Sequence, residues 1–216
     1  MVNVDKLIDE IEKLEKEIQE IVRAGEGRIV KVILETSLLT EDEKEHGICF
    51  VDIGGGTTDL AVFYEGILKH TAVIPFGGEN ITNDIRLGLG VLKTQAEAMK
   101  VQFGSALADE AKTNSFITIP GLKGMPAKEI SVKSLAQIIQ ARMSEILDFV
   151  TYHLKQVGLD SRALNGGIIL TGGGSQLKHL IQLTEYRQST HRVHRLLHFQ
   201  MIHFLVKLPV NRSSHA

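Results

Sequence analysis

The stretch GICFVDIGGGTTDLAVF, residues 47–63, decides the fold, because it places three consecutive glycines between two runs of strand-forming residues. A glycine inside a strand weakens the sheet, since it loses much backbone entropy on folding and packs no side chain. Gly54, Gly55 and Gly56 lie between two carboxylates, Asp52 and Asp59. We therefore expect two strands joined by a turn that needs a bare backbone.

Composition narrows the class of protein. A chain of 216 residues with 43% hydrophobic and 23% charged residues is long enough for one globular domain or two small lobes. The formal net charge of -2 argues against nucleic-acid binding, which needs a concentrated basic surface. We expect a compact protein with no nucleic-acid partner.

Cysteine content and hydropathy indicate the compartment. Cys49 is the one cysteine of the chain, so neither a disulfide framework nor a cysteine-based zinc site is expected. Its apolar neighbours favour a core position over a reactive one. No apolar run has the length of a membrane span, and the N-terminus lacks the layout of a signal peptide. These features predict a cytoplasmic protein.

Residues 1–27 have the pattern of an amphipathic helix. Apolar residues recur at alternating steps of three and four, which is typical of a coiled-coil seam, and Gly25 and Gly27 are expected to end the helix. Two interpretations stay open: self-association through this seam, or a helix that docks on its own domain. The seam residues are Val4, Leu7, Ile11, Leu14, Ile18 and Ile21.

The central region, residues 28–186, has the pattern of a mixed α/β fold. The strand-like stretches 58–66 and 67–76 predict a hairpin that turns near Glu65 and Gly66. A long amphipathic helix is predicted after Ser131, ending before Gly158. Further strands are predicted at 28–34, 47–53, 114–120 and 166–170, and helices at 80–89, 94–103, 132–156 and up to about 186.

The segment 187–216 differs in composition from the rest of the chain. It contains neither Asp nor Glu, and it holds five of the nine histidines. Three interpretations compete: a basic helix that touches a membrane surface, a metal tract of His191, His194 and His198 at helical spacing, or a tail not shaped by the fold, such as a shifted reading frame. The third is favoured, because His-rich tracts without carboxylate or cysteine partners rarely form defined sites.

The first glycine cluster has a chemical interpretation. Backbone N–H groups of a Gly54–Gly55–Gly56 turn can converge on an anion such as a phosphate, and Thr57 and Thr58 can donate hydroxyl hydrogen bonds to it. Carboxylates beside a phosphate need a cation between them, so Asp52 and Asp59 indicate Mg²⁺. The alternative is a glycine-rich turn without a ligand, which the flanking carboxylates and threonines disfavour.

A second glycine cluster, in IILTGGGSQLKHL, follows a predicted buried strand and opens a predicted helix. The N–H groups and the positive end of a helix dipole favour an anion or a nucleotide. Between the two clusters, Glu97 and Lys100 stand three residues apart on one predicted helix face. They are able to hydrogen-bond a ribose, but their spacing alone favours an ordinary surface ion pair.

These motifs resemble those of a known family. DIGGGTTDLAVF is similar to the second phosphate motif of the actin superfamily of ATPases, and TGGGSQL to its adenosine motif. HTAVIPFGGENITNDIRLGLG and AEAMKVQFGSA more specifically resemble the bacterial actin-like cell-division family FtsA. The resemblance covers roughly residues 39–186. It implies the second half of an actin-like (ribonuclease H-like) ATPase fold with an inserted smaller lobe at about 83–165.

The resemblance also implies roles for individual residues. Asp52 would act as the catalytic-water and Mg²⁺ carboxylate, and Asp59 would support the metal. Glu97 and Lys100 would approach the ribose of ATP. The terminal phosphates would be held by Gly54, Gly55, Gly56, Thr57 and Thr58, and the adenosine would be bordered by Gly172, Gly173, Gly174 and Ser175.

At the level of the whole protein, the resemblance implies Mg-ATP-dependent polymerisation and the tethering of the tubulin-like division protein FtsZ to the inner face of the membrane during septum formation. The family's early phosphate motif on a first half is not found in this sequence, so a partial or truncated relative is expected, with at most weak ATPase activity. The alternatives are another actin-superfamily ATPase, of chaperone or pilus-assembly type, and an inactive fragment.

Overall fold

A strand that ends at the three glycines occupies the centre of the sheet in the computed structural model, which describes residues 47–112, 114–121 and 126–195. All of these residues belong to one unit, residues 39–200. The helix predicted at 1–27, the strand predicted at 28–34 and the segment 196–216 lie outside the described residues.

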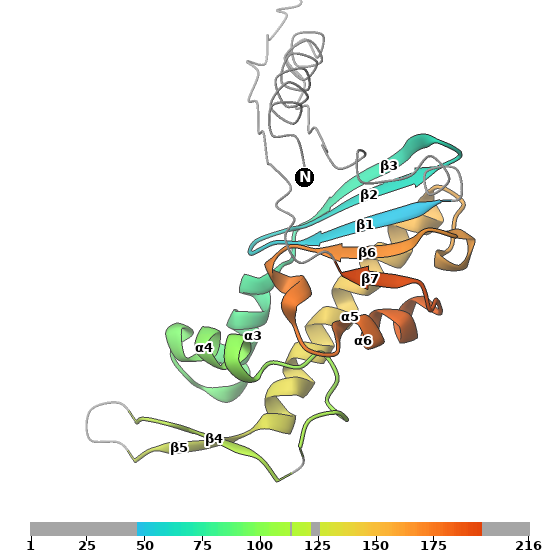
Figure 1. The fold of residues 1–216 in the computed structure, drawn as a ribbon. Coiled ribbons are helices and arrows are strands. Elements are labelled where there is room, and N and C mark those ends of the chain that lie inside the picture. The colour runs from blue at the N-terminus through green and yellow to red at the C-terminus, as the bar shows by residue number, and fades with distance from the viewer. Residues whose placement is uncertain (1–46, 113, 122–125, 196–216) are drawn as a thin grey trace, which may run out of the picture. The chain divides into compact units, whose positions relative to one another are not determined.

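The described elements include both strands and helices, as the sequence predicts for a mixed α/β fold (Figure 1). In chain order they are β1 (Ile48–Ile53), β2 (Thr58–Tyr64), β3 (Ile67–Ile74), α3 (Gly78–Leu89), α4 (Lys93–Phe103), β4 (Phe116–Ile119), β5 (Lys128–Ser131), α5 (Val132–Gln156), η2 (Ser161–Ala163), β6 (Gly167–Thr171), η3 (Gly173–Gln176), α6 (Leu180–Gln188) and β7 (Val193–Arg195).

Within the described residues, the main sheet has five strands in the order β3-β2-β1-β6-β7. The first three strands pair antiparallel, whereas β1, β6 and β7 run parallel to one another. The β2–β3 hairpin turns at Glu65 and Gly66, whose φ angles of 54° and 75° match a tight two-residue turn. The predicted hairpin is therefore confirmed.

The hydrophobic core lies between the sheet and the helices. Alternate residues of β1, namely Cys49, Val51 and Ile53, pack in one cluster with residues of α5 such as Met143 and Ile146. Burial raises the pKa of the Cys49 thiol, which keeps it protonated and unreactive. The prediction of a core cysteine is confirmed.

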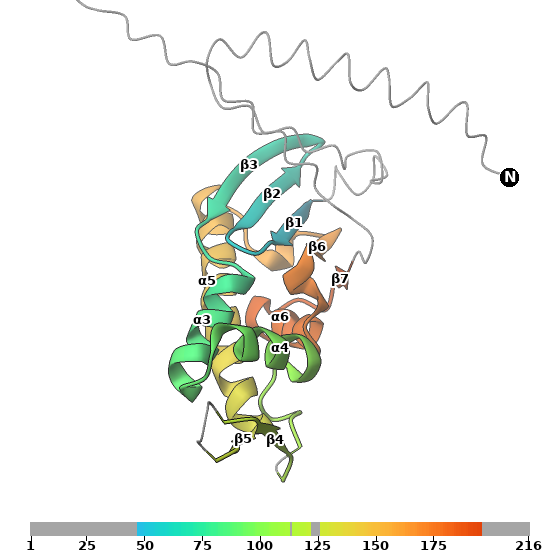
Figure 2. The ribbon, with the colours of Figure 1, turned by 90° about the vertical axis from the view of Figure 1, so that its left-hand side faces the viewer.

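Helix α5 is the longest of the described elements and joins the main sheet to a small second sheet. Ser131 caps its first turn by accepting a hydrogen bond from the Ser134 amide. One end of α5 packs against the main sheet, and the β4–β5 hairpin lies at the other end (Figures 1 and 2). Residues of the predicted inserted lobe, including Ile117 and Ile130, belong to the same core cluster as the sheet.

The sheet continues past the residue at which the sequence pattern ended it. Helix α6 runs to Gln188, and β7 then pairs in parallel with β6, Val193 opposite Ile168. A three-residue strand has too few positions to show periodicity, so the prediction of an unshaped tail from residue 187 is wrong for residues 187–195. His194 lies in a strand, which also excludes helical spacing for the proposed metal tract in this part.

Among the described residues, no helix is both long enough and apolar enough to span a membrane.

Candidate functional site

The first glycine turn is attached to the start of helix α3. Within the turn, the Gly54 amide donates to the Thr57 carbonyl at 2.9 Å. The Gly54 and Gly55 carbonyls accept hydrogen bonds from the Gly78 and Glu79 amides, at 2.9 and 2.7 Å. These bonds satisfy two of the amides that a helix leaves unpaired at its N-terminus, and they fix the turn against α3.

The backbone of this turn is open on its outer side. A Cβ atom added at Gly55 or Gly56 would meet no atom within 4 Å. The amides of these two residues have no hydrogen-bond acceptor among the described residues. Two of the three predicted amides are thus available for an anion, whereas the Gly54 amide is used inside the turn.

Two further glycines, which are not among the predicted site residues, make this attachment possible. A Cβ at Gly77 would lie 2.6 Å from the Gly55 carbonyl oxygen and 2.7 Å from that of Gly54. Gly78 follows as the first residue of α3. A glycine pair directly before a predicted helix was the available signal for this close approach.

The two predicted metal carboxylates project from the same face of the sheet. Asp52 in β1 lies opposite Asp59 in β2, and on its other side opposite Thr171 in β6. Both carboxylates are buried, at 6% and 4% exposure. Their oxygen chemistry fits Mg²⁺ held through waters, and no group of three or more His, Cys, Asp or Glu residues suited to a metal occurs among the described residues.

The second glycine turn approaches Asp52 closely. Gly172 has a φ of 80°, and a Cβ there would lie 2.2 Å from Asp52 Oδ1. Gly173 is open, whereas a Cβ at Gly174 would lie 2.3 Å from Ile53 Cγ2. Asp52 is therefore placed between the two glycine turns, although the sequence pattern assigns it to only the first.

The prediction that a helix opens directly at the second glycine cluster is wrong, because the helix begins several residues later. Residues Gly173–Gln176 form the short 3₁₀ turn η3, and α6 begins only at Leu180. A single turn carries little of the dipole that a longer helix would provide. The hydroxyl of buried Ser175 donates to the Gly172 carbonyl at 2.8 Å, so its proton is used within the turn.

A cleft of about 1060 Å³ brings the two glycine turns together with helix α4. Six of the predicted site residues line it: Gly54, Gly55, Glu97, Lys100, Gly173 and Gly174. Apart from these, its wall includes Gly78, Glu79, Lys93, Thr94, Val101, Gln176 and Lys178. The other predicted residues, Asp52, Gly56, Thr57, Thr58, Asp59, Gly172 and Ser175, do not line this cleft.

Thr58 has a structural contact in place of the predicted phosphate contact. Its side chain is fully buried, and its hydroxyl donates to the Phe76 carbonyl at 2.8 Å. A hydroxyl has one proton, so in this arrangement it has none to give to a phosphate.

Glu97 and Lys100 form the predicted i,i+3 ion pair, with 2.8 Å between Lys100 Nζ and Glu97 Oε2. The pair lies in the cleft rather than on an open helix face. Burial raises the pKa of Glu97, but hydrogen bonds from Lys100 and Thr82 outweigh it, so the pKa of this carboxyl lies below its usual value. Glu97 is therefore held as a carboxylate, a hydrogen-bond acceptor.

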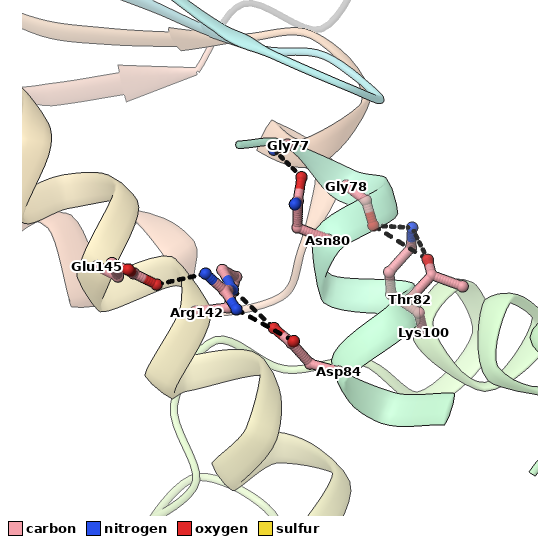
Figure 3. A network of polar contacts seen from close by, with 8 residues as sticks. All are labelled: Gly77, Gly78, Asn80, Thr82, Asp84, Lys100, Arg142 and Glu145. Carbon is pink, nitrogen blue, oxygen red and sulfur yellow. Dashed lines mark hydrogen bonds and ion pairs between the residues drawn. The ribbon is translucent and has the colours of Figure 1, made fainter. Parts of the chain in front are cut away.

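An arginine on α5 fastens α3 in place, and no local pattern in the sequence indicates it. Arg142 Nε and Nη2 donate to the two oxygens of Asp84 at 2.6 and 3.1 Å, and Nη1 donates to Glu145 (Figure 3). These hydrogen bonds raise the pKa of Arg142. Its guanidinium also lies over the Phe76 ring, 5.2 Å from the centroid.

Solved structures identify the fold as that of the actin-like ATPases. MreB5 of Spiroplasma citri bound to AMPPNP has a TM-score of 0.59 and 23% identity over 71% of this chain and 49% of that chain. The MamK double helical filament has a TM-score of 0.57 and 16% identity over 69% of this chain and 49% of that chain. The predicted fold class is confirmed.

Sequence comparison then identifies the family. The model of the family "Cell division protein FtsA" matches residues 49–211. Cell division protein FtsA of Pseudomonas aeruginosa is 40% identical over 173 residues, and that of Neisseria meningitidis serogroup B is 42% identical over 149. The alignments cover 78% and 69% of this chain, respectively. The chain belongs to the FtsA family of cell-division proteins, as the motifs indicated.

The alignments cover only part of each relative, and the family match runs past the boundary that the motifs predicted. This chain spans 41% of the length of the Pseudomonas relative and 36% of the Neisseria one. The family match also extends to residue 211, past residue 186 where the motifs end.

Proposed function

We propose that the cleft binds an adenine nucleotide, ATP or ADP, with the phosphates at the first glycine turn and the adenosine at the second. One observation carries this proposal: three distant parts of the sequence line one cleft. They are the first glycine turn (Gly54 and Gly55), Glu97 and the second glycine turn (Gly173 and Gly174). The Gly55 amide supplies a donor for phosphate oxygens, and Glu97 supplies an acceptor for a ribose hydroxyl. The nucleotides bound to the MreB5 structures agree with this class of ligand.

Asp52 and Asp59 are the residues that would hold Mg²⁺, which would supply charge neutralisation for the phosphates. The position of Asp52 directly before the first turn and against Gly172 supports a proposed role in accepting a hydrogen bond from a water near the phosphates. In that role Asp52 would orient the water that attacks the terminal phosphate.

Binding by the 216-residue polypeptide is expected to be weak. The ammonium of Lys100 is used inside the protein, so phosphate charge meets mainly backbone amides and the exposed Lys93. A missing charge-assisted hydrogen bond costs about 1.5–3 kcal/mol. We therefore expect dissociation constants in the high-micromolar range and negligible turnover.

Isothermal titration with ATP and ADP, with and without Mg²⁺, tests this proposal. Asp52→Ala is expected to abolish the Mg²⁺ dependence but to leave metal-free binding in place. Nanomolar affinity, or multiple-turnover hydrolysis that Asp52→Ala abolishes, would contradict the expected weakness. No binding by a folded sample at millimolar ATP would overturn the nucleotide assignment itself.

For the cell, we propose the role that the family resemblance implies: a cytoplasmic protein at the inner face of the membrane that links FtsZ to it during septum formation. The segment 83–165 is proposed to hold the FtsZ-docking surface, and residues 1–27 to support self-association. A transient contact of this kind has a micromolar dissociation constant, about 8 kcal/mol. Fluorescence anisotropy with a labelled FtsZ C-terminal peptide tests the docking, and no binding at hundreds of micromolar peptide would refute it.

A further inference from the structure

Thr82 lies behind the cleft, and the family resemblance assigns it no role. It is on α3, 1% exposed, and its hydroxyl is the meeting point of three polar groups. Its Oγ1 lies 2.5 Å from Glu97 Oε2, 3.0 Å from the Gly78 carbonyl oxygen and 2.8 Å from Lys100 Nζ. Figure 3 shows this hydroxyl facing Lys100 and Gly78.

The ammonium of Lys100 has a full set of partners inside the protein. Its three N–H groups have three acceptors: the Gly78 carbonyl at 2.9 Å, Thr82 Oγ1 at 2.8 Å and Glu97 Oε2 at 2.8 Å. The side chain is only 13% exposed. A ligand would have to displace one of these bonds to reach the ammonium, so Lys100 is placed to support the site rather than to contact the ligand.

The single proton of the Thr82 hydroxyl is directed toward Glu97. Lys100 Nζ has no acceptor atom, so it donates to Thr82 Oγ1, and the hydroxyl proton is left for one of the two oxygens nearby. The Glu97 carboxylate is both charged and closer than the Gly78 carbonyl, 2.5 against 3.0 Å. Glu97 Oε2 therefore receives two hydrogen bonds, while Oε1 has no partner among the described residues.

Lys100 and Gly78 also connect Glu97 with the first glycine turn. The Gly78 carbonyl accepts from Lys100, and the Gly78 amide donates to the Gly54 carbonyl at 2.9 Å. The glycine turn and the Glu97 carboxylate are thus joined through one residue of α3 and one of α4.

We infer that Thr82 and Lys100 are positioning residues that hold the Glu97 carboxylate by Oε2, so that Oε1 is presented to a hydroxyl-bearing ligand such as the ribose of a nucleotide. The inference rests on the proposed nucleotide site and replaces the ribose contact that the family resemblance implies for Lys100. Thr82 accordingly acts on the nucleoside end of the ligand and not on its phosphates.

Thr82→Val tests this inference, because it keeps the shape of the side chain and removes the hydroxyl. By NMR titration of the full chain, its dissociation constant for ATP should rise about threefold to tenfold, while that for inorganic tripolyphosphate stays within about twofold. Thr82→Ser should restore ATP binding. Thr184→Val is the matched control, since Thr184 is a buried threonine whose hydroxyl bonds the Leu180 carbonyl in α6, away from the cleft.

A second measurement needs no ligand. The pKa of the Glu97 carboxyl, followed by carbon-detected NMR, should rise in Thr82→Val and return in Thr82→Ser, and it should not change in Thr184→Val. An unchanged pKa, or an equal loss of ATP and tripolyphosphate affinity, would overturn the positioning role. Absence of ATP binding in the parent chain together with a raised pKa in Thr82→Val would support the positioning role and refute the proposed nucleotide site.

Discussion

Replacing Arg142 by methionine removes the contacts that fasten α3 to α5. The guanidinium makes two charge-assisted hydrogen bonds to Asp84 at 2.6 and 3.1 Å and one to Glu145 at 2.5 Å. Its side chain is 22% exposed and that of Asp84 is 28% exposed, so solvent screens this pair only in part. Methionine keeps most of the apolar volume, so the loss falls on the polar contacts.

The magnitude follows from these contacts. Hydrogen bonds to charged groups are worth about 1.5–3 kcal/mol when buried, and the contact with the Phe76 ring adds about 0.5–1 kcal/mol. Partial exposure lowers the total, so we expect Arg142→Met to cost about 2 kcal/mol of unfolding free energy. For a domain of this size, that corresponds to a fall of about 4–8 °C in Tm.

Urea denaturation and thermal melts followed by circular dichroism measure this loss. A double-mutant cycle with Asp84→Asn should give a coupling energy above about 1 kcal/mol, because the two residues share both hydrogen bonds. Arg162→Met is the matched control: it breaks an exposed pair with Asp160 and should leave Tm unchanged. A Tm within about 1 °C of the parent for Arg142→Met would refute the reasoning.

Three further outcomes are expected. Gly172→Ala should lower the free energy of unfolding by about 2 kcal/mol or more, because the new Cβ would meet the buried Asp52 carboxylate and the backbone has a positive φ. Gly173→Ala is the control and should be tolerated, since a Cβ there meets no atom. A loss of unfolding free energy in Gly172→Ala as small as that in Gly173→Ala would show that the turn can shift. Cys49 should react with a thiol reagent only after unfolding, and fast labelling of the native chain would contradict its burial. Burial, together with the neighbouring His70 ring, lowers the pKa of His153, so the fold favours the neutral imidazole. The contribution of His153 to stability should therefore be complete above the unfolded pKa of about 6.5, and it should be lost as the pH falls through the lower pKa of the folded state. His153→Gln should flatten that part of the stability–pH curve measured by urea denaturation, and an unchanged slope would count against the histidine pair.

Local patterns in the sequence were enough to identify most strands and helices and the family. Two runs of strand-forming residues in residues 47–63 marked β1 and β2, and apolar residues at helical spacing after Ser131 marked α5 as Val132–Gln156. Two glycine clusters, each placed after a strand, marked two walls of the cleft. These features are local in sequence: the periodicity of a strand or helix and the freedom of a glycine are visible within about ten residues.

The polar groups that remain for a ligand could be recognised only once the packing of distant elements was known. Lys100 and Thr58 match the family motifs in type, but each already uses a donor on a partner 18 residues away in sequence, Thr82 for Lys100 and Phe76 for Thr58. Arg142 meets Asp84 across 58 residues, and β7 is a strand only because β6 offers it a parallel edge. A hydrogen-bond partner is set by packing between distant elements, and no periodicity within one segment encodes it.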